Sequence, residues 1–136
     1  MAITFPKNSE AALENLRKII FGSEVSYQIA THPYNRKGIA EAEIVGGNLS
    51  ILYSLLGSES QVNTQGKILF IEDLDEYLYH IDRMIQALKR AGMLKNLAGL
   101  IVGGMSDMND NTIPFGKTAE EIISGAVSEY KYPVVS

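Results

Sequence analysis

The stretch GKILFIEDLDEYLYHIDRM, residues 66–84, decides the fold expected of this sequence. Its first part, KILFI, is a continuous apolar run of strand length, which is typical of a strand covered on both faces. The run ends on two adjacent carboxylates, Glu72 and Asp73, and a helical pattern begins almost at once. The two acids could carry the chemistry of the protein, or they could only separate two secondary-structure elements.

The helix expected after this strand has clear signals at both ends. Asp73 and Glu76, three residues apart, indicate a start that resembles a capping box. Lys89 and Arg90, followed by Gly92, are favoured at a helix C-terminus, where cations and a left-handed glycine stabilise the last carbonyls. Between the two ends, one apolar stripe runs at helical spacing through Leu78, Ile81, Ile85 and Leu88.

Patterns on either side of this stretch predict an alternating order of helices and strands. Before it, we expect a helix from Asn8 or Ser9 to Gly22, edge strands at 25–30 and 38–47, and a short helix at 49–57 capped by Asn48. After it, we expect a buried strand at 97–104, a loop, a helix at 117–130 and a last strand that opens at Pro133.

This rhythm implies right-handed crossovers and therefore a mostly parallel sheet. The predicted fold is a single α/β domain over residues 1–136, of the three-layer swivelling type, with helices flanking a mostly parallel sheet. A last strand that has only just begun at Ser136 leads us to expect a fragment of a longer protein.

Composition narrows the classes of function. The chain has 136 residues, a formal charge of −4 and no basic run, so neither nucleic acid nor an anionic membrane is an expected partner. It contains no cysteine and two histidines, which disfavours a disulfide framework and a metal site. The N-terminus lacks the layout of a secretory signal and no apolar run reaches membrane-spanning length, so we expect a cytoplasmic protein.

Two strands are expected to end on a Gly-Gly pair, in EIVGGNLS (43–50) and LIVGGMSD (100–107). In open parallel sheets the ligand crevice lies outside the carboxyl ends of the strands. These ends, together with Glu72 and Asp73, should therefore form one rim. Each Gly-Gly pair could equally be a tight turn that needs positive φ or lacks room for a side chain. Neither copy has the spacing of a phosphate loop, so a nucleotide-binding protein is disfavoured.

Side chains alternate along a strand, so Glu72 and Asp73 should point to opposite faces of the sheet. We therefore expect Asp73 to cap the following helix and Glu72 to face the rim, where it could orient a partner. Capping and solvation alone would also explain both acids.

The other candidate residues are weak. His80 follows Glu76 by one helical turn but lacks the second histidine of a metal motif, so a surface pair is expected. His32 should only fill a turn. Ser106 has Met108 where a nucleophile elbow requires glycine. The residues themselves thus offer one orienting carboxylate and no nucleophile–base pair.

Three markers, G-G-N-L-S, I-E-D and Y-x-x-D-R-M, lie in the segments 38–58 and 66–107. From Gly38 onward the sequence resembles the C-terminal domain of LD-carboxypeptidases, serine peptidases of the S66 type that include the microcin C immunity peptidases. The resemblance implies a Ser-Glu-His triad that cuts the bond between an L-centre and a terminal D-amino acid in murein peptides, with no cofactor. Glu72 matches the triad glutamate, whose role is to hold the histidine tautomer and stabilise the imidazolium.

The same resemblance places the nucleophilic serine on an N-terminal domain and the histidine beyond the last strand, and neither has a match here. We therefore expect a truncated domain that carries only Glu72 of the triad and is inactive alone, while its full-length parent acts on a murein-type peptide. The alternative is a non-enzymatic fragment or engineered scaffold that forms a homo-oligomer through its uncovered sheet edges.

Overall fold

The computed structural model describes residues 9–136 and divides the chain into two compact units, Met1–Thr31 and His32–Ser136. The first unit contains helix α1, Glu10–Ile20, whose N-cap Ser9 accepts a hydrogen bond from the amide of Ala12 at 3.2 Å. The predicted start at Ser9 is confirmed, and the alternative start at Asn8 lies outside the described residues. That residues 1–136 form a single domain stays a prediction.

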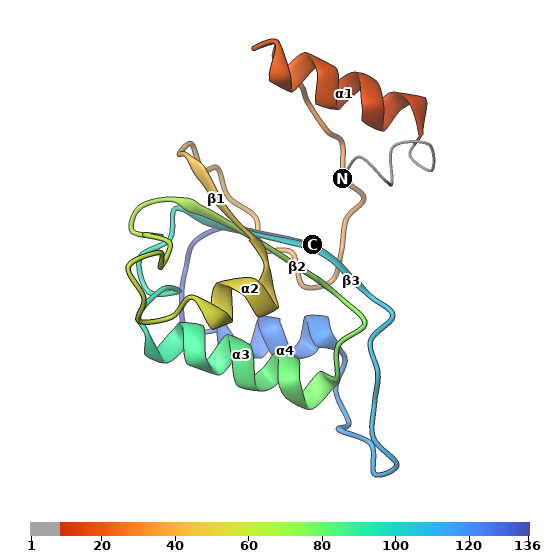
Figure 1. The fold of residues 1–136 in the computed structure, drawn as a ribbon, viewed down its shortest axis with the longest axis vertical. Coiled ribbons are helices and arrows are strands. Elements are labelled where there is room, and N and C mark those ends of the chain that lie inside the picture. Colours follow the sequence, from red (N-terminus) through yellow and green to blue (C-terminus); the bar gives the residue numbers. More distant parts are fainter. Residues whose placement is uncertain (1–8) are drawn as a thin grey trace. The chain divides into compact units, whose positions relative to one another are not determined.

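The second unit is built on a four-stranded, all-parallel sheet with the strand order β1-β2-β3-β4 (Figure 1). The strands are β1 Ile44–Asn48, β2 Ile68–Leu74, β3 Gly99–Ser106 and β4 Val134–Val135. The helices of this unit are α2 Leu49–Ser54, α3 Leu78–Arg90 and α4 Ala119–Ala126. The predicted α/β class, with a parallel sheet and flanking helices, is confirmed.

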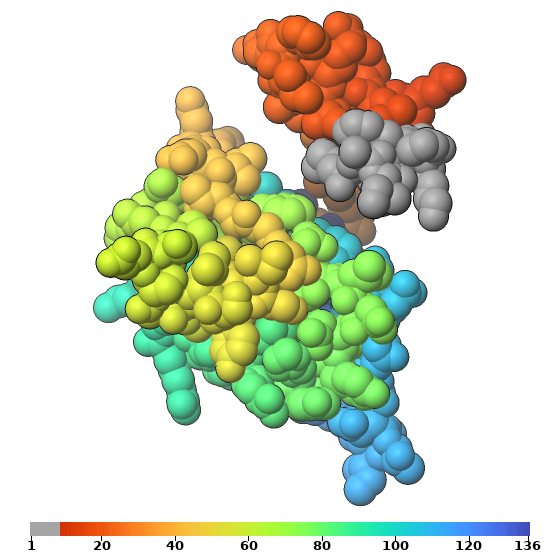
Figure 2. Space-filling model, viewed as in Figure 1, coloured from red at the N-terminus to blue at the C-terminus, as the bar shows by residue number. Residues whose placement is uncertain are grey.

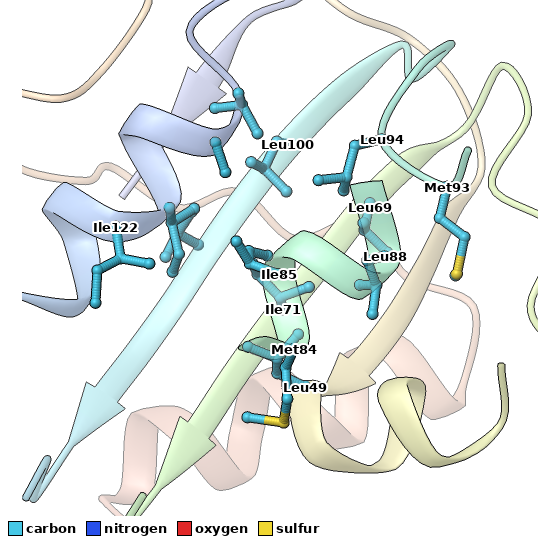
Figure 3. Packing of buried hydrophobic residues seen from close by; sticks show 14 of the residues in the cluster. Leu49, Leu69, Ile71, Met84, Ile85, Leu88, Met93, Leu94, Leu100 and Ile122 are labelled. Atoms are coloured by element: carbon cyan, nitrogen blue, oxygen red, sulfur yellow. The ribbon is translucent and has the colours of Figure 1, made fainter. Parts of the chain in front are cut away.

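The core of this unit lies between one face of the sheet and these helices. Leu69 and Ile71 of β2 are fully buried against α3, where Ile85 and Leu88 point toward them (Figure 3). Burial of each such side chain contributes about 1.5–3 kcal/mol. Buried residues of α2 and α4 belong to the same cluster, so α2, α3 and α4 all cover one face. No helix among residues 32–136 covers the other face of the sheet.

Of the two predicted edge strands, the first is wrong and the second is confirmed only in its last part. Residues 25–30 form no strand, and of the segment 38–47 only the part from Ile44 onward is in the sheet. The alternation around Ile39 does not bury a face, since this side chain is 97% exposed. The segment instead crosses the uncovered face of the sheet, because a Cβ added to Gly99 of β3 would lie 3.4 Å from the Cβ of Ala40.

The predicted start of α3 is also wrong, although its end is confirmed. Strand β2 continues through Leu74, and the N-cap of α3 is Tyr77, which makes no capping hydrogen bond through its side chain. At the other end, Gly92 adopts a φ of 78°, the left-handed conformation expected of a glycine after a helix. Lys89 donates across to the carbonyl of Ala126 at 2.9 Å and so joins α3 to α4.

Arg36, which the sequence patterns did not single out, joins the end of α4 to the last strand. Its guanidinium donates to the carbonyl oxygens of Val127 at 3.1 Å and Tyr132 at 3.2 Å, and also to that of Tyr130. Its backbone forms a bridge with Val134 of β4. Carbonyls at a helix C-terminus need such partners, since the helix itself leaves them unpaired.

Gly46 of β1 allows a test of how closely β1 packs against β2. Its φ is 126°, and an added Cβ would lie 2.0 Å from the carbonyl oxygen of Phe70 on β2. We predict that Gly46→Ala lowers the free energy of unfolding by at least about 2 kcal/mol, measured by urea denaturation. The matched control is Gly125→Ala in α4, where an added Cβ meets no atom within 4 Å. The control should be neutral or stabilising by up to about 1 kcal/mol, and equal losses in both variants would contradict the prediction.

Tyr132 provides a second test, because its buried hydroxyl has no hydrogen-bond partner among the described residues. Burial raises the pKa of Tyr132 above its ordinary value. Above about pH 10 the unfolded chain therefore loses a phenol proton that the folded chain keeps, and stability falls as the pH rises.

We predict that Tyr132→Phe reduces this alkaline loss and is neutral or stabilising at pH 7, since it removes an unpaired polar group. Urea unfolding at about pH 7, 9 and 10.5 measures both effects. Tyr27→Phe, at an exposed position, is the control and should keep the pH dependence of the unaltered protein. An unchanged alkaline loss in Tyr132→Phe would show that another group is responsible.

Candidate functional site

The carboxyl ends of three strands meet at one edge of the sheet. Asn48 of β1 pairs with Glu72 of β2, and Leu74 of β2 pairs with Ser106 of β3. The two Gly-Gly segments thus lie on either side of Glu72. The rim that the sequence predicted from these strand ends is confirmed, and it lies where parallel sheets place their ligands.

Glu72 and Asp73 point to opposite faces of the sheet, as their alternation predicted. Asp73 is 3% exposed and follows Leu69 and Ile71 on the face that the helices cover. Glu72 follows Phe70 on the other face and is partly exposed. Within residues 9–136 its carboxylate forms no hydrogen bond or ion pair with another residue. Glu72 can therefore accept a hydrogen bond from a group outside this part of the chain.

A β-bulge lies opposite Glu72. Ile71 pairs with Val102, but Asp73 pairs with Met105, so β3 contributes one residue more than β2 over this interval. The residues between the two pairs on β3 include the Gly-Gly of LIVGGMSD. Bulges are frequent beside active sites, because they redirect side chains and end the regular ladder.

Glycines on both neighbouring strands make room for Phe70 and Glu72. A Cβ added to Gly103 would lie 2.9 Å from the ring of Phe70 and 3.2 Å from the Cβ of Glu72. On the other side, Gly46 approaches the backbone of Phe70 too closely for any side chain. We call Gly46, Gly103, Phe70 and Glu72 the glycine slot. Gly46 is explained by backbone packing, whereas at Gly103 the missing side chain accommodates the ring of Phe70 and the Cβ of Glu72.

Asp73 caps a helix, but not the one that was predicted. Its carboxylate accepts hydrogen bonds from the side-chain amide of Asn48 at 2.9 Å, from the amide and hydroxyl of Ser50 at 3.0 and 2.6 Å, and from the amide of Leu74 at 2.9 Å. It therefore holds the start of α2 rather than that of α3. Figure 2 shows α2 (yellow) lying directly against the residues that follow β2 (green). The parallel pairing of β1 with β2 brings α2 to this position.

Glu76 and His80 form the surface pair that their spacing predicted, with 2.8 Å between Oε2 and Nδ1. The hydroxyl of Ser50 lies 3.4 Å from the other oxygen of Glu76 but only 2.6 Å from Asp73, which is its better acceptor. Serine, glutamate and histidine thus lie in a row with the glutamate in the middle. A general base must contact the nucleophile itself, so these residues are not a nucleophile–base pair.

The remaining candidates also take structural roles. His32 accepts a hydrogen bond from the amide of Asn35 at 3.0 Å through its carbonyl, and its ring lies beside Tyr34, as expected of a residue that fills a turn. Ser106 accepts from the amide of Asp75 at 3.0 Å through its carbonyl. Gly103 belongs to a Gly-Gly pair for which a lack of room for a side chain was one of the predicted explanations, and its contacts with Phe70 agree with that explanation. Sequence patterns missed the role of Ser50 as a donor to Asp73, although Ser50 ends the marker G-G-N-L-S.

No helix among residues 9–136 has both the length and the apolar character needed to cross a membrane.

Comparison with known proteins identifies the family. The family of LD-carboxypeptidase C-terminal domains matches residues 41–136. A "probable murein peptide carboxypeptidase" of Bacillus subtilis is 55% identical over 65 residues, which are 48% of this chain and 20% of that protein. The crystal structure of muramoyltetrapeptide carboxypeptidase from Oxalobacter formigenes superposes with a TM-score of 0.81 at 28% identity, over 93% of this chain and 43% of that one.

The microcin C7 self-immunity protein MccF has the same fold, with a TM-score of 0.58 at 24% identity over 68% of this chain and 28% of that one. The chain spans less than half the length of each of these relatives. Since the family match covers residues 41–136, which hold the whole sheet and its carboxyl edge, this chain belongs to the family of LD-carboxypeptidase C-terminal domains.

Proposed function

We propose that this chain is the truncated C-terminal domain of a serine-type LD-carboxypeptidase and that Glu72 is the catalytic glutamate of its triad. The reaction is hydrolysis of an L-to-D peptide bond, which releases a terminal D-amino acid from a murein-type peptide in the cytoplasm. The observation that carries the proposal is the partly exposed carboxylate of Glu72 at the carboxyl edge of the sheet, unpaired within residues 9–136. Family membership and the names of the relatives support it.

The chemistry requires a carboxylate with a free acceptor oxygen. In a serine triad the acid accepts the Nδ1–H of the histidine, holds the correct tautomer and stabilises the imidazolium that forms. Glu72 has such an oxygen. Both oxygens of Asp73, in contrast, already accept hydrogen bonds from Asn48, Ser50 and Leu74 of the same chain. Glu76 is already bonded to His80. Of Glu72, Asp73 and Glu76, Glu72 alone has a carboxylate that forms no hydrogen bond within residues 9–136, so its two oxygens are both available to a donor from another part of the parent protein.

The serine and histidine of the triad would come from other parts of the parent protein. Neither Ser50 with His80 nor any other pair among the described candidates has the contact between nucleophile and base that peptide hydrolysis requires. We therefore propose that this chain by itself is inactive and that its catalytic contribution is Glu72.

A chimeric enzyme tests this proposal. Residues 41–136 replace the matching segment of the Bacillus subtilis relative, and release of D-alanine from an L-Lys- or diaminopimelate-containing tetrapeptide is measured. We predict that the chimera is active and that Glu72→Gln lowers kcat by about 10³–10⁴-fold, because the neutral amide leaves the histidine in the wrong tautomer. The isolated chain should release no D-alanine above the buffer rate.

The control is Glu59→Gln, the same chemical change at an exposed loop position, which should leave kcat unchanged. Full activity of Glu72→Gln in the chimera would refute the proposed role of Glu72. Hydrolysis by the isolated chain would refute its proposed inactivity.

The alternative function is self-association without catalysis, and one observation favours it. Strand β1 forms an edge of the sheet, and its residue Ile44 is 61% exposed. An unpaired edge with an apolar side chain can pair with a second copy. This alternative predicts a homo-oligomer whose elution in size-exclusion chromatography shifts with concentration, and Ile44→Lys should abolish the shift. A monomer at every concentration would contradict it.

A further inference from the structure

We propose that Asp73 is the positioning residue of this edge: by anchoring the end of β2 to the start of α2, it sets the direction in which Glu72 projects. The inference rests on the proposed function, since the catalytic effect of the positioning requires that Glu72 act in the triad. Asp73 itself touches no reacting group in this scheme, and it acts only through Glu72.

The first step is that hydrogen bonds fix the side chain of Asp73 in place. Asp73 is almost fully buried, and its two carboxylate oxygens accept four hydrogen bonds, of which the shortest is 2.6 Å from the hydroxyl of Ser50. Hydrogen bonds to an ionised acceptor are shorter and stronger than those between neutral groups. A buried carboxylate cannot exchange these donors for water, so its side chain is held in one orientation.

The second step is that the orientation of Asp73 determines the direction of the Glu72 side chain. Successive side chains of a strand point to opposite faces, so an Asp73 side chain fixed toward α2 turns Glu72 toward the uncovered face. Asn48, which donates to Asp73 at 2.9 Å, is also the residue that pairs with Glu72 in the sheet. The carboxylate of Asp73, the residue that follows Glu72, is therefore bonded to Asn48, the residue that pairs with Glu72 on β1.

The third step is that little else can hold Glu72 in place. On the β3 side the regular pairing is interrupted between Ile71 and Asp73, so the ladder does not include Glu72 there. Gly103 has no side chain to pack against it. Three residues after Glu72, Asp75 has a φ of 58°, which ends the extended conformation. Glu72 itself is thus restrained by its pairing with Asn48 of β1 and by its neighbours Ile71 and Asp73, of which Asp73 is also fixed by its side chain.

Two substitutions in the anchor and one control test this inference. Asp73→Asn keeps the size of the side chain but places an amide where the structure needs an acceptor. Ser50→Ala is the milder variant, which removes only the hydroxyl donor and leaves the carboxylate in place. The control is Asp75→Asn, the same chemical change on an exposed carboxylate of the same segment, where asparagine tolerates the left-handed backbone.

The first measurement is made on the isolated chain and needs no catalysis. The Cβ of Glu72 lies close to Gly103, so the protein should show a nuclear Overhauser effect between the β protons of Glu72 and the α protons of Gly103. We expect this signal to weaken in Asp73→Asn and in Ser50→Ala and to persist in Asp75→Asn. The spectra are taken in the absence of denaturant on variants whose folded fraction has been verified. A weaker signal then reports a reoriented Glu72 rather than an unfolded chain.

The second measurement uses the chimeric enzyme described above. We expect Asp73→Asn to lower kcat by about 10–100-fold with KM changed less than about twofold, because a misplaced triad acid affects the chemical step more than substrate binding. Ser50→Ala should lower kcat less, and Asp75→Asn should leave it unchanged. If Asp73→Asn does not fold, Ser50→Ala decides the result.

A purely structural Asp73 would give a different pattern. Both anchor variants would then unfold at lower denaturant concentration but keep the Glu72–Gly103 signal and the kcat of the unaltered chimera, and this result would overturn the inference. Failure of the proposed function is recognised separately. In that case Glu72→Gln keeps full activity, and the nuclear Overhauser measurement alone decides whether Asp73 orients Glu72.

Discussion

The buried carboxylate of Asp73 is the constraint on which the carboxyl edge of this sheet depends. It joins the end of β2 to Asn48 and Ser50 at the start of α2, with distances of 2.6–3.0 Å. An ionised group removed from water is stable only if its acceptors are filled. Because its donors include Asn48 at the end of β1 and Ser50 at the start of α2, the carboxylate links two strands and a helix at one point.

The one-sided arrangement of the helices gives this edge its chemical asymmetry. Helices α2, α3 and α4 bury one face of the sheet, so every second residue of β2, namely Leu69, Ile71 and Asp73, is buried beneath them. The other face of β2 ends on Glu72, which no helix of residues 32–136 covers. One strand thus supplies an anchoring acid to the core and an unpaired acid to the opposite face.

Predictions from helical periodicity and from the continuous apolar run agree with the structure, whereas the alternation around Ile39 does not form a strand. The stripe through Ile81, Ile85 and Leu88 is buried, and the apolar run before Glu72 is a central strand. Predictions that depended on sequence proximity were less reliable. Asp73 was assigned to the nearest following helix, but its donors lie 23 and 25 residues earlier in the chain. The alternation around Ile39 also resembled a strand, although no neighbouring strand pairs with it.

The amino-acid sequence was enough to predict the α/β class, the positions of the main strand and helix, and the division of Glu72 and Asp73 between the two faces of the sheet. These features follow from spacing along the chain, since strand and helix periods are local properties. The three-dimensional structure was needed to show which helix Asp73 caps, that a bulge lies opposite Glu72, and that Gly103 accommodates the ring of Phe70. These features depend on how β1, β2 and β3 align, and parallel pairing joins residues that are far apart in the sequence.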